Sequence, residues 1–453
     1  MKSTPTHDIN TRSFSVGNTV RDLIRINPRF RRSVQIELDL NDRTSTESYV
    51  ATDFVTNCLK RISVAFERGS SQRAWRITGD YGSGKSAFTL ALAKAAAGRD
   101  EEIPARMRGI ISEKAIATVV VTGDREPIVR GIGRAVIDQV AGLKGAQLPT
   151  TTEELLNLLA TARKQVKKNG AKGVLLILDE LGKNLEYSTL EPQNSDVYSL
   201  QRLAEFASRS GDNPLIVLGI LHQGISSYTA DMDTATRREW DKVAGRFDEI
   251  IFAHPLEQTV QLCAEALNID TGALPDHVLH EARQSMKWAV DSGLYGSSST
   301  EILTDLAPRL FPLHPTVLPP LLTILRRFAQ NERSLFGFLT GYEPKSLQEH
   351  AGVSVDQAKF FRLGDLYEYF IANLSYMMTN GKATHWRIIE SVVRQASGSE
   401  ATDLATLKSI GILNLIDDDS LLATKEMIQE SVGRFTAKNL NKSLELLKKQ
   451  HVL

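Results

Sequence analysis

The sequence has little of what a secreted, membrane or metal-cluster protein needs. Only two cysteines, Cys58 and Cys263, occur in 453 residues, and they stand too far apart to form a disulfide framework or a zinc knuckle. No apolar run approaches the roughly 18 residues of a membrane span, and the first residues lack the apolar core of a signal peptide. We therefore expect a cytoplasmic protein without membrane contact.

The sequence also lacks an excess of charge of either sign. Lys plus Arg and Asp plus Glu both total 54, which excludes a global positive field that would draw the chain to nucleic acid. Any such contact would need a local patch. The hydrophobic fraction of 42% and charged fraction of 24% are those of a globular protein, and the length predicts two or three domains.

The first part of the chain predicts an extension and then a helix. Residues 1–45 form an N-terminal extension in which residues 34–40 (Val-Gln-Ile-Glu-Leu-Asp-Leu) alternate between apolar and polar types. That alternation predicts a half-buried strand. Apolar residues recur at helical spacing over 46–68, which predicts a helix leading into the next domain.

From residue 73 the pattern changes to strands that alternate with helices. Five apolar strands are expected near residues 74–78, 117–122, 173–178, 214–221 and 250–252. Their apolar runs are continuous, which indicates burial on both faces and hence a mostly parallel sheet covered by helices. We expect an α/β fold of the P-loop NTPase type over residues 46–255.

After residue 255 the sequence predicts helices almost throughout. Residues 256–350 are expected to form a helical lid, with a flexible loop at 292–300. Residues 351–453 are expected to be helical and to end in a winged-helix-like unit: a helix, a short strand, two helices and the start of a wing strand at His451-Val-Leu. We expect the native protein to continue beyond Leu453.

One glycine-rich stretch carries the strongest chemical signal. Gly79-Asp-Tyr-Gly-Ser-Gly-Lys85-Ser86 matches the phosphate-binding pattern G-x-x-x-x-G-K-[ST] and stands between a predicted strand and an Ala-rich helix. Its backbone N–H groups can converge on phosphate oxygens, Lys85 can reach the β- and γ-phosphates, and the Ser86 hydroxyl can ligate Mg²⁺. The predicted nucleotide ligands are Gly79, Asp80, Tyr81, Gly82, Ser83, Gly84, Lys85, Ser86 and Ala87.

A competing interpretation of this stretch is a dinucleotide fingerprint. Gly82-x-Gly84-x-x-Ala87 fits that pattern loosely, but Lys85-Ser86 and the absence of an acidic strand end about 20 residues later argue against it.

The strand at 174–178 ends in two carboxylates, Asp179 and Glu180. After a P-loop, that arrangement predicts that Asp179 holds the Mg²⁺ and that Glu180 orients and deprotonates the attacking water. The competing interpretation is a buried strand that ends in ordinary solvated acids. Since Asp is followed by Glu rather than by an apolar residue, we expect hydrolysis of ATP and not binding alone.

A further apolar strand ends in His222 and Gln223. In a P-loop sheet, the strand between those of the two motifs presents a polar residue beside the γ-phosphate, so either side chain could distinguish ATP from ADP. The alternative is a polar strand end with no such role.

Together these motifs resemble the AAA+ ATPases, most closely the origin-recognition and STAND-type branch. The resemblance implies that Arg246, in Gly245-Arg-Phe before the fifth strand, acts as an arginine finger on a neighbour's nucleotide. Arg237 and Arg238 are nearby alternatives, and a surface pair with Asp248 or Glu249 is the plainer interpretation.

The resemblance also implies a homo-oligomer and further nucleotide contacts. Arg333 is the candidate lid arginine, with Arg326 and Arg327 as alternatives, and a solvated helix face would explain all three as well. Tyr49, expected at the start of the first core helix, would line the adenine pocket, although core packing explains it equally.

A second resemblance concerns the role of the protein. Asp179-Glu-Leu-Gly-Lys183, Glu239-Trp-Asp-Lys and the segment from Leu313-His-Pro-Thr to Leu339 resemble large ATP-binding proteins of prokaryotic phage-defence systems, including BREX-type systems. That resemblance implies a motor or switch working with other protein subunits of a defence complex. The alternative is a DNA-binding replication initiator or loader, and a nucleotide-locked scaffold is a third hypothesis.

Overall fold

The computed structural model describes most of the chain, in two compact units. One unit comprises Pro28–Leu262 with Ala329–Ser334, and the other comprises Met1–Asn27, Cys263–Phe328 and Leu335–Leu453. The predicted division into residues 1–45, 46–255, 256–350 and 351–453 has other boundaries and stays a prediction. The structure describes residues 19–30, 34–191, 197–228, 234–328, 334–374, 381–396, 400–433 and 437–449.

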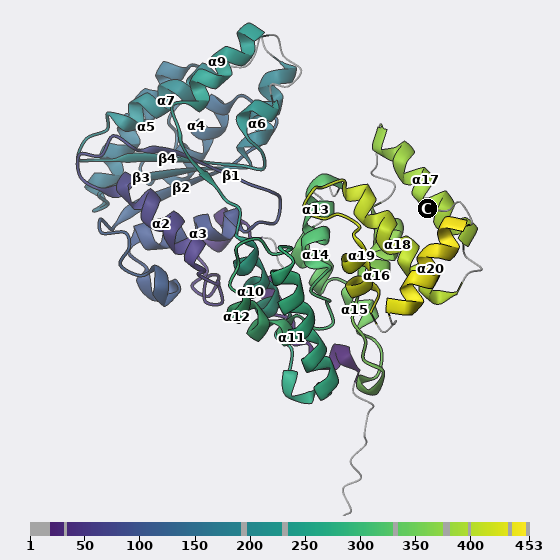
Figure 1. Ribbon diagram of the computed structural model, residues 1–453. Helices are drawn as coiled ribbons and strands as arrows, with labels where there is room; N and C mark the ends of the chain where they lie inside the picture. The colour runs from purple at the N-terminus through teal and green to yellow at the C-terminus, as the bar shows by residue number, and fades with distance from the viewer. Residues whose placement is uncertain are drawn as a thin grey trace, which may run out of the picture. The chain divides into compact units, whose positions relative to one another are not determined.

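The first unit contains a parallel five-stranded sheet, which confirms the predicted α/β class (Figure 1). Its strands stand in the order β2-β3-β4-β1-β5. Their bounds are β1 (Ala74–Thr78), β2 (Ile116–Thr122), β3 (Gly173–Asp179), β4 (Leu215–Leu221) and β5 (Asp248–Ile251). β4 thus lies between the strand before the P-loop and the strand that ends in Asp179, as AAA+-type P-loop sheets require.

Helices cover both faces of this sheet (Figure 1). One face packs against α2 (Asp53–Ser63) and α3 (Lys85–Ala97). The other packs against α4 (Ile128–Gln139), α5 (Thr152–Lys168), α6 (Leu181–Leu190), α7 (Tyr198–Ser208) and α9 (Thr234–Ala244), with the short α8 (Ile225–Tyr228) beside them. The residues of β3 and β4 are almost wholly buried, which explains their unbroken apolar runs.

The strand predicted at residues 34–40 is wrong. Residues Ile36–Asp39 form one helical turn, α1, in which the Asp39 carboxylate accepts the Gln35 N–H at 3.0 Å. Of the alternating apolar residues, Ile36 is buried, whereas Leu38 is 69% exposed. α1 packs on α3 and beside the edge strand β2. Among the described residues no strand pairing joins it to β2, so the alternating segment does not extend the sheet.

The helix predicted from residue 46 begins later, at Asp53. Thr52 caps it, since its hydroxyl accepts the Val55 N–H at 3.3 Å. Tyr49 therefore lies in the turn before α2 and not on the helix, and it packs at the margin of the core.

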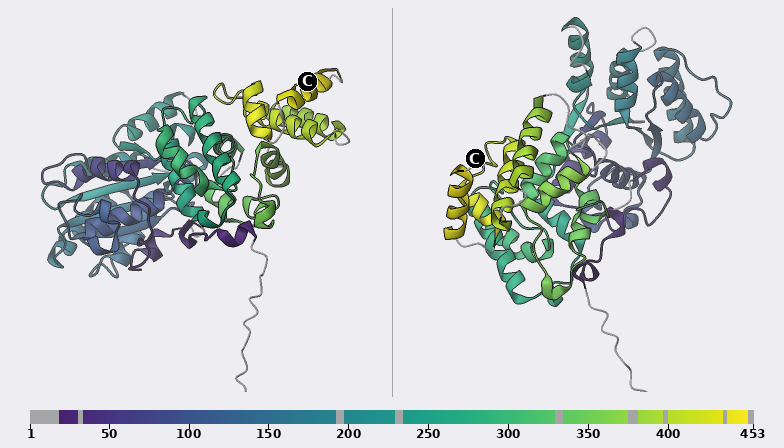
Figure 2. Two further views of the ribbon diagram at one scale, coloured as in Figure 1. Left: turned by 60° about the horizontal axis from the view of Figure 1, so that its bottom comes forward. Right: turned by 90° about the vertical axis from the view of Figure 1, so that its right-hand side faces the viewer.

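Helices joined by turns and loops make up the regular structure of the second unit in its described residues, in agreement with the predicted helical C-terminal region (Figure 2). Its N-terminal segment Thr19–Asn27 pairs with the backbone of residues 266–270 and 351–354. The helices are α10 (Leu256–Leu267, shared between the two units), α11 (Asp276–Asp291), α12 (Thr300–Leu306), α13 (Leu318–Phe328), α14 (Leu335–Thr340), α15 (Leu347–His350), α16 (Leu363–Asn373), α17 (Gly381–Gln395), α18 (Ala401–Ile416), α19 (Lys425–Val432) and α20 (Ala437–Lys449). None of the helices in the described residues is long and apolar enough to cross a membrane.

The short strand predicted between the first two helices of residues 404–453 is wrong. The residues between α18 and α19 turn instead at Asp418, whose carboxylate accepts both the N–H and the hydroxyl of Ser420. The expected wing at His451-Val-Leu lies outside the described residues.

A buried ion pair lies at the end of α3, and its lysine also bonds to the segment that precedes α2. The Lys94 ammonium is fully buried, lies 3.2 Å from Glu102 Oε2 and donates to the carbonyl of Asp42 at 2.6 Å. Glu102 also receives two hydrogen bonds from Arg99. Every charged group here has a partner, which is the condition for burying charge without a large loss of stability.

Glu102→Ala is therefore expected to lower the free energy of unfolding by about 3–5 kcal/mol, because it leaves the Lys94 ammonium buried and unpaired. Urea unfolding measures this change. Glu101→Ala, one residue away on an exposed side chain, serves as the control with little effect. Equal stability of the two variants would contradict the structural role of the pair.

Candidate nucleotide-binding site

The predicted P-loop occupies the turn between β1 and α3. At its start, the backbone passes so close to Phe252 that a Cβ on Gly79 would lie 2.5 Å from the Phe252 carbonyl oxygen. The Phe252 N–H also donates to the Thr78 carbonyl at 2.6 Å. Only glycine fits at position 79, and the loop is held against the segment that follows β5.

The first turn of α3 presents unpaired backbone donors. In the described part of the chain, the N–H groups of Gly84, Lys85, Ser86 and Ala87 donate to no protein acceptor. Four such groups at the positive end of a 13-residue helix form a site suited to anions such as phosphate.

Lys85 is buried in the loop, with a relative exposure of only 4%. Its Nζ donates to the carbonyls of Gly79 at 2.7 Å and Asp80 at 2.8 Å, which leaves one of three N–H donors for a ligand. Burial lowers the pKa of Lys85 to about 8, while the nearby charges of Asp80 and Asp179 act to raise it. A phosphate placed beside this ammonium would favour its charged form further.

Asp179 ends β3 and Glu180 follows it, and the two carboxylates have different surroundings. Burial raises the pKa of Asp179 to about 6, although the Glu180 N–H donates to Asp179 Oδ1 at 3.0 Å and opposes that shift. The Lys85 charge acts on Asp179 as well, so the two predicted motifs converge at the carboxyl edge of the sheet. Glu180 has a left-handed backbone (φ 52°), and its carboxylate pairs with Lys183 at 2.5 Å.

His222 follows β4 and faces the P-loop. Its ring centroid lies 5.2 Å from that of Tyr81. Burial lowers the pKa of His222, and the positive charge of Lys85 lowers it further. Gln223, the alternative sensor, is exposed.

Two buried polar atoms at this edge have no hydrogen-bond partner in the described chain: Ser83 Oγ and His222 Nδ1. Unpaired buried polar atoms are uncommon and call for an explanation. The phosphate oxygens of a nucleotide can accept hydrogen bonds, and its bound water can both donate and accept them. A nucleotide would therefore give Ser83 Oγ and His222 Nδ1 the partners they lack, so the residues present fit such a ligand.

The oxygen atoms that could act as metal ligands in this site also fit Mg²⁺. The Ser86 hydroxyl and the Asp179 carboxylate are hard ligands, and nucleotide-bound Mg²⁺ uses one or two carboxylates together with phosphates and water. Accordingly, no group of three or more His, Cys, Asp or Glu side chains gathers as a metal cage in the described residues.

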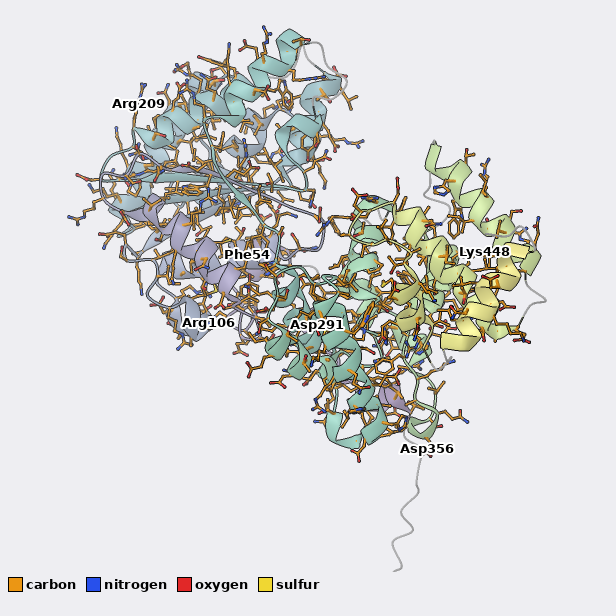
Figure 3. The ribbon with its side chains drawn as sticks, viewed as in Figure 1. Phe54, Arg106, Arg209, Asp291, Asp356 and Lys448 are labelled. Atoms are coloured by element: carbon orange, nitrogen blue, oxygen red, sulfur yellow. The ribbon has the colours of Figure 1, made fainter. Side chains whose placement is uncertain are left out.

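An aromatic cluster that the sequence did not single out lies next to the loop. Phe54, on α2 (labelled in Figure 3), has its ring 5.2 Å from Phe252 and 4.9 Å from His254. The Gln258 side chain accepts the Phe54 N–H at 2.9 Å. Burial lowers the pKa of His254 to about 4, so this ring is neutral at physiological pH. Because the backbone of Phe252 lies against Gly79, this cluster is an apolar neighbour of the loop. The role of Tyr49 in an adenine pocket stays a prediction.

Arg246 lies apart from these groups in its own chain. It is exposed, and its Nη2 is 3.4 Å from Glu205 Oε1 of α7. The plainer interpretation had named Asp248 or Glu249 as its partner. Glu249 instead accepts from Arg76 at 2.9 Å and from Thr78 at 2.8 Å, so that choice of Glu249 was wrong. The alternatives Arg237 and Arg238 lie exposed on α9.

The predicted lid arginine, Arg333, lies outside the described residues. Its neighbour Ser334 is placed at the P-loop, where a Cβ on Gly82 would be 2.4 Å from the Ser334 Cβ. Of the alternatives, Arg327 is engaged elsewhere, since it bonds to the Ile416 carbonyl and lies 3.5 Å from the Asp418 carboxylate. Arg326 stays a prediction.

No protein-family model and no curated protein sequence matches the chain. Solved structures of the Aeropyrum pernix ORC2 protein resemble it remotely. The ADPNP–ADP complexes are 13% identical over 94% of this chain and 90% of that chain, with a TM-score of 0.38. The ADP form is 14% identical over 87% and 84%, with a TM-score of 0.36. At these scores the fold assignment depends on the strand order and the P-loop and not on this likeness.

Lys85→Ala is expected to abolish nucleotide binding, because it removes the one ammonium buried in the loop. Titration with a fluorescent ATP analogue measures the affinity. Lys172→Ala, at an exposed lysine paired with Glu113, is the control and should bind normally. An affinity of Lys85→Ala close to that of the wild type would contradict the assignment of the site.

Proposed function

We propose that this chain binds Mg-ATP at the P-loop and hydrolyses it, and that it works as an AAA+-like motor or switch in a multi-subunit assembly. The observation that carries the proposal is the convergence of Lys85, Asp179 and His222 at one edge of the sheet. They lie at or after the carboxyl ends of three adjacent strands, β1, β3 and β4, in the order that a P-loop sheet uses.

Each residue has a definite task in the proposed reaction. The N–H groups at the start of α3 and the Lys85 ammonium hold the phosphates and offset their charge. Ser86 and Asp179 would hold Mg²⁺, which would supply positive charge to offset that of the phosphates. His222 is the proposed sensor of the γ-phosphate, and the contact of its ring with Tyr81 in the loop supports that role. The aromatic cluster of Phe54, Phe252 and His254 gives an apolar surface for the base.

Glu180 is the proposed general base. It follows Asp179 directly, and its carboxylate is partly exposed, so that water can reach it. It accepts a proton from water as the water oxygen bonds to the γ-phosphorus and the bond to the ADP oxygen breaks. The products are ADP and inorganic phosphate.

The role in phage defence depends on the sequence resemblance alone. A DNA-acting initiator or loader is the second candidate, and the remote likeness to ORC2 structures points in that direction. Against it, residues 401–453 hold seven Lys or Arg and seven Asp or Glu. A surface that enters a DNA groove is normally basic, so we favour a protein client for the C-terminal helices.

Glu180→Gln should retain ATP but turn it over at least about 10²-fold more slowly, since general-base catalysis contributes about 10²–10⁴-fold. Phosphate release at saturating Mg-ATP measures the rate, and analogue titration measures retained binding. Glu186→Gln, on the exposed side of α6, is the matched control. Persistent turnover in Glu180→Gln would show that another group is the base.

Arg246 tests whether hydrolysis needs a neighbouring subunit. If Arg246 acts on the partner's nucleotide, specific activity rises with protein concentration, and Arg246→Ala lowers turnover while sparing ATP affinity. Arginine fingers contribute about 10³–10⁵-fold as a general range. Mixing Arg246→Ala with Glu180→Gln subunits should restore part of the rate, because some interfaces then pair an intact base with an intact finger. Activity independent of concentration, with no rescue on mixing, would make Arg246 an ordinary partner of Glu205.

A further inference from the structure

The carboxylate proposed as the general base is already engaged in an ion pair. Glu180 Oε2 lies 2.5 Å from the Nζ of Lys183, one turn further along the chain at the start of α6. A carboxylate oxygen that accepts from an ammonium is less available to take a proton from water. The pair therefore competes with the reaction.

The backbone of Glu180 is fixed, so only its side chain can respond to this competition. Gly123, which follows β2, donates its N–H to the Asp179 carbonyl at 2.7 Å. A Cβ on Gly123 would lie 2.3 Å from the Glu180 carbonyl oxygen, so glycine is required there. The buried Asn184 side chain donates to the Glu126 carbonyl at 3.0 Å and fastens the same loop to α6. The left-handed backbone of Glu180 is thus held from both sides.

The loop after β2 offers Lys183 a second acidic partner. The Lys183 side chain is half exposed, and the charges that favour its ammonium form come from Glu180 and Asp124, which together raise its pKa. Asp124 is exposed, and one of its carboxylate oxygens accepts the Arg125 N–H at 2.7 Å. No ion pair joins Lys183 to Asp124 in the described structure, so the Glu180 pair is the arrangement present.

We propose that Lys183 is a positioning residue that holds Glu180 out of reaction, and that Asp124 is the alternative acceptor to which Lys183 moves when Glu180 acts as base. This inference depends on the proposed ATP hydrolysis by Glu180. It assigns a role to the loop from Gly123 to Glu126, which borders both the base and the start of α6. A partner that binds Asp124 or Lys183 would then change the rate of hydrolysis without touching the nucleotide.

The expected size of the effect follows from the exposure of the pair. Exposed Lys–Glu pairs contribute about 0–1 kcal/mol, and about 1 kcal/mol corresponds to about a fivefold change in rate. Lys183→Met should therefore raise kcat by up to about fivefold with KM unchanged. Lys183→Arg keeps the pair and should stay close to the wild type.

The experiment is a set of variants of the full chain, assayed for phosphate release at saturating Mg-ATP. Asp124→Asn, which keeps the hydrogen bond to the Arg125 N–H, should lower kcat because Lys183 loses its second acceptor. In the Lys183→Met background, Asp124→Asn should have no further effect. Lys242→Met removes a comparable exposed pair with Glu239 (2.7 Å, also three residues apart) and is the control that should leave kcat unchanged.

The dependence of kcat on ionic strength distinguishes this role of Lys183 from a purely structural one. Salt at about 0.5 M screens exposed pairs strongly, so the kcat of the wild type should rise towards that of Lys183→Met, whose own kcat should stay flat. If the wild type hydrolyses ATP but kcat is unchanged or lower in Lys183→Met, the proposed role of Lys183 is wrong and the proposed hydrolysis stands. Absence of turnover in the wild type would instead overturn the proposed function, and the inference with it.

Discussion

The approach of the loop backbone to Phe252 is the constraint on which the site depends. Gly79 leaves β1 against the carbonyl oxygen of Phe252, and the Phe252 N–H bonds back to the last residue of β1. This contact joins the phosphate loop to the segment after β5, and through Phe252 to Phe54 and His254. A side chain at position 79 would push these two segments apart. The phosphate loop and the aromatic cluster of Phe54, Phe252 and His254 would then no longer be held against each other.

The groups proposed to bind the nucleotide and those proposed to act in catalysis differ in how deeply they are buried. Lys85 and Asp179 are buried, and burial lowers the pKa of Lys85 to about 8 and raises that of Asp179 to about 6. A nearby phosphate would favour the charged form of Lys85, and a nearby Mg²⁺ that of Asp179. Glu180 and Lys183 lie nearer the surface, where an ion pair forms and breaks at small cost. We infer that the buried groups make nucleotide binding selective for Mg-ATP. We infer that the more exposed pair of Glu180 and Lys183 would allow a partner outside the site to change the rate.

The sequence predicted the sheet and the phosphate loop well, for a physical reason. Continuous apolar strands have few alternatives to a covered parallel sheet, and the loop pattern specifies its own turn and helix start. The strand prediction for residues 34–40 failed because alternation over seven residues specifies a strand only when the segment pairs with a neighbouring strand. This segment instead forms the helical turn α1 beside the edge strand β2. The start of α2 was missed because the signal for it, the Thr52 cap, is local and weak against apolar periodicity that begins at Val50.

The parts of the site that depend on long-range packing were beyond the sequence. Phe54 and His254 are 200 residues apart, and nothing in either segment points to the other. The partner of Arg246 proved to be Glu205 on α7, whereas sequence proximity favoured Asp248 and Glu249. The pair of Glu180 with Lys183 is different, because it is local: the two residues stand three positions apart, a spacing at which side chains on a helix can meet.

We expect the turn between β1 and α3 to hold one Mg-nucleotide per chain. Calorimetric titration of the full chain with a slowly hydrolysed ATP analogue, with and without Mg²⁺, measures this binding. We expect one site per chain, tighter binding with Mg²⁺ than with a chelator present, and competition by ADP. No saturable binding, or binding that Mg²⁺ does not affect, would contradict this expectation.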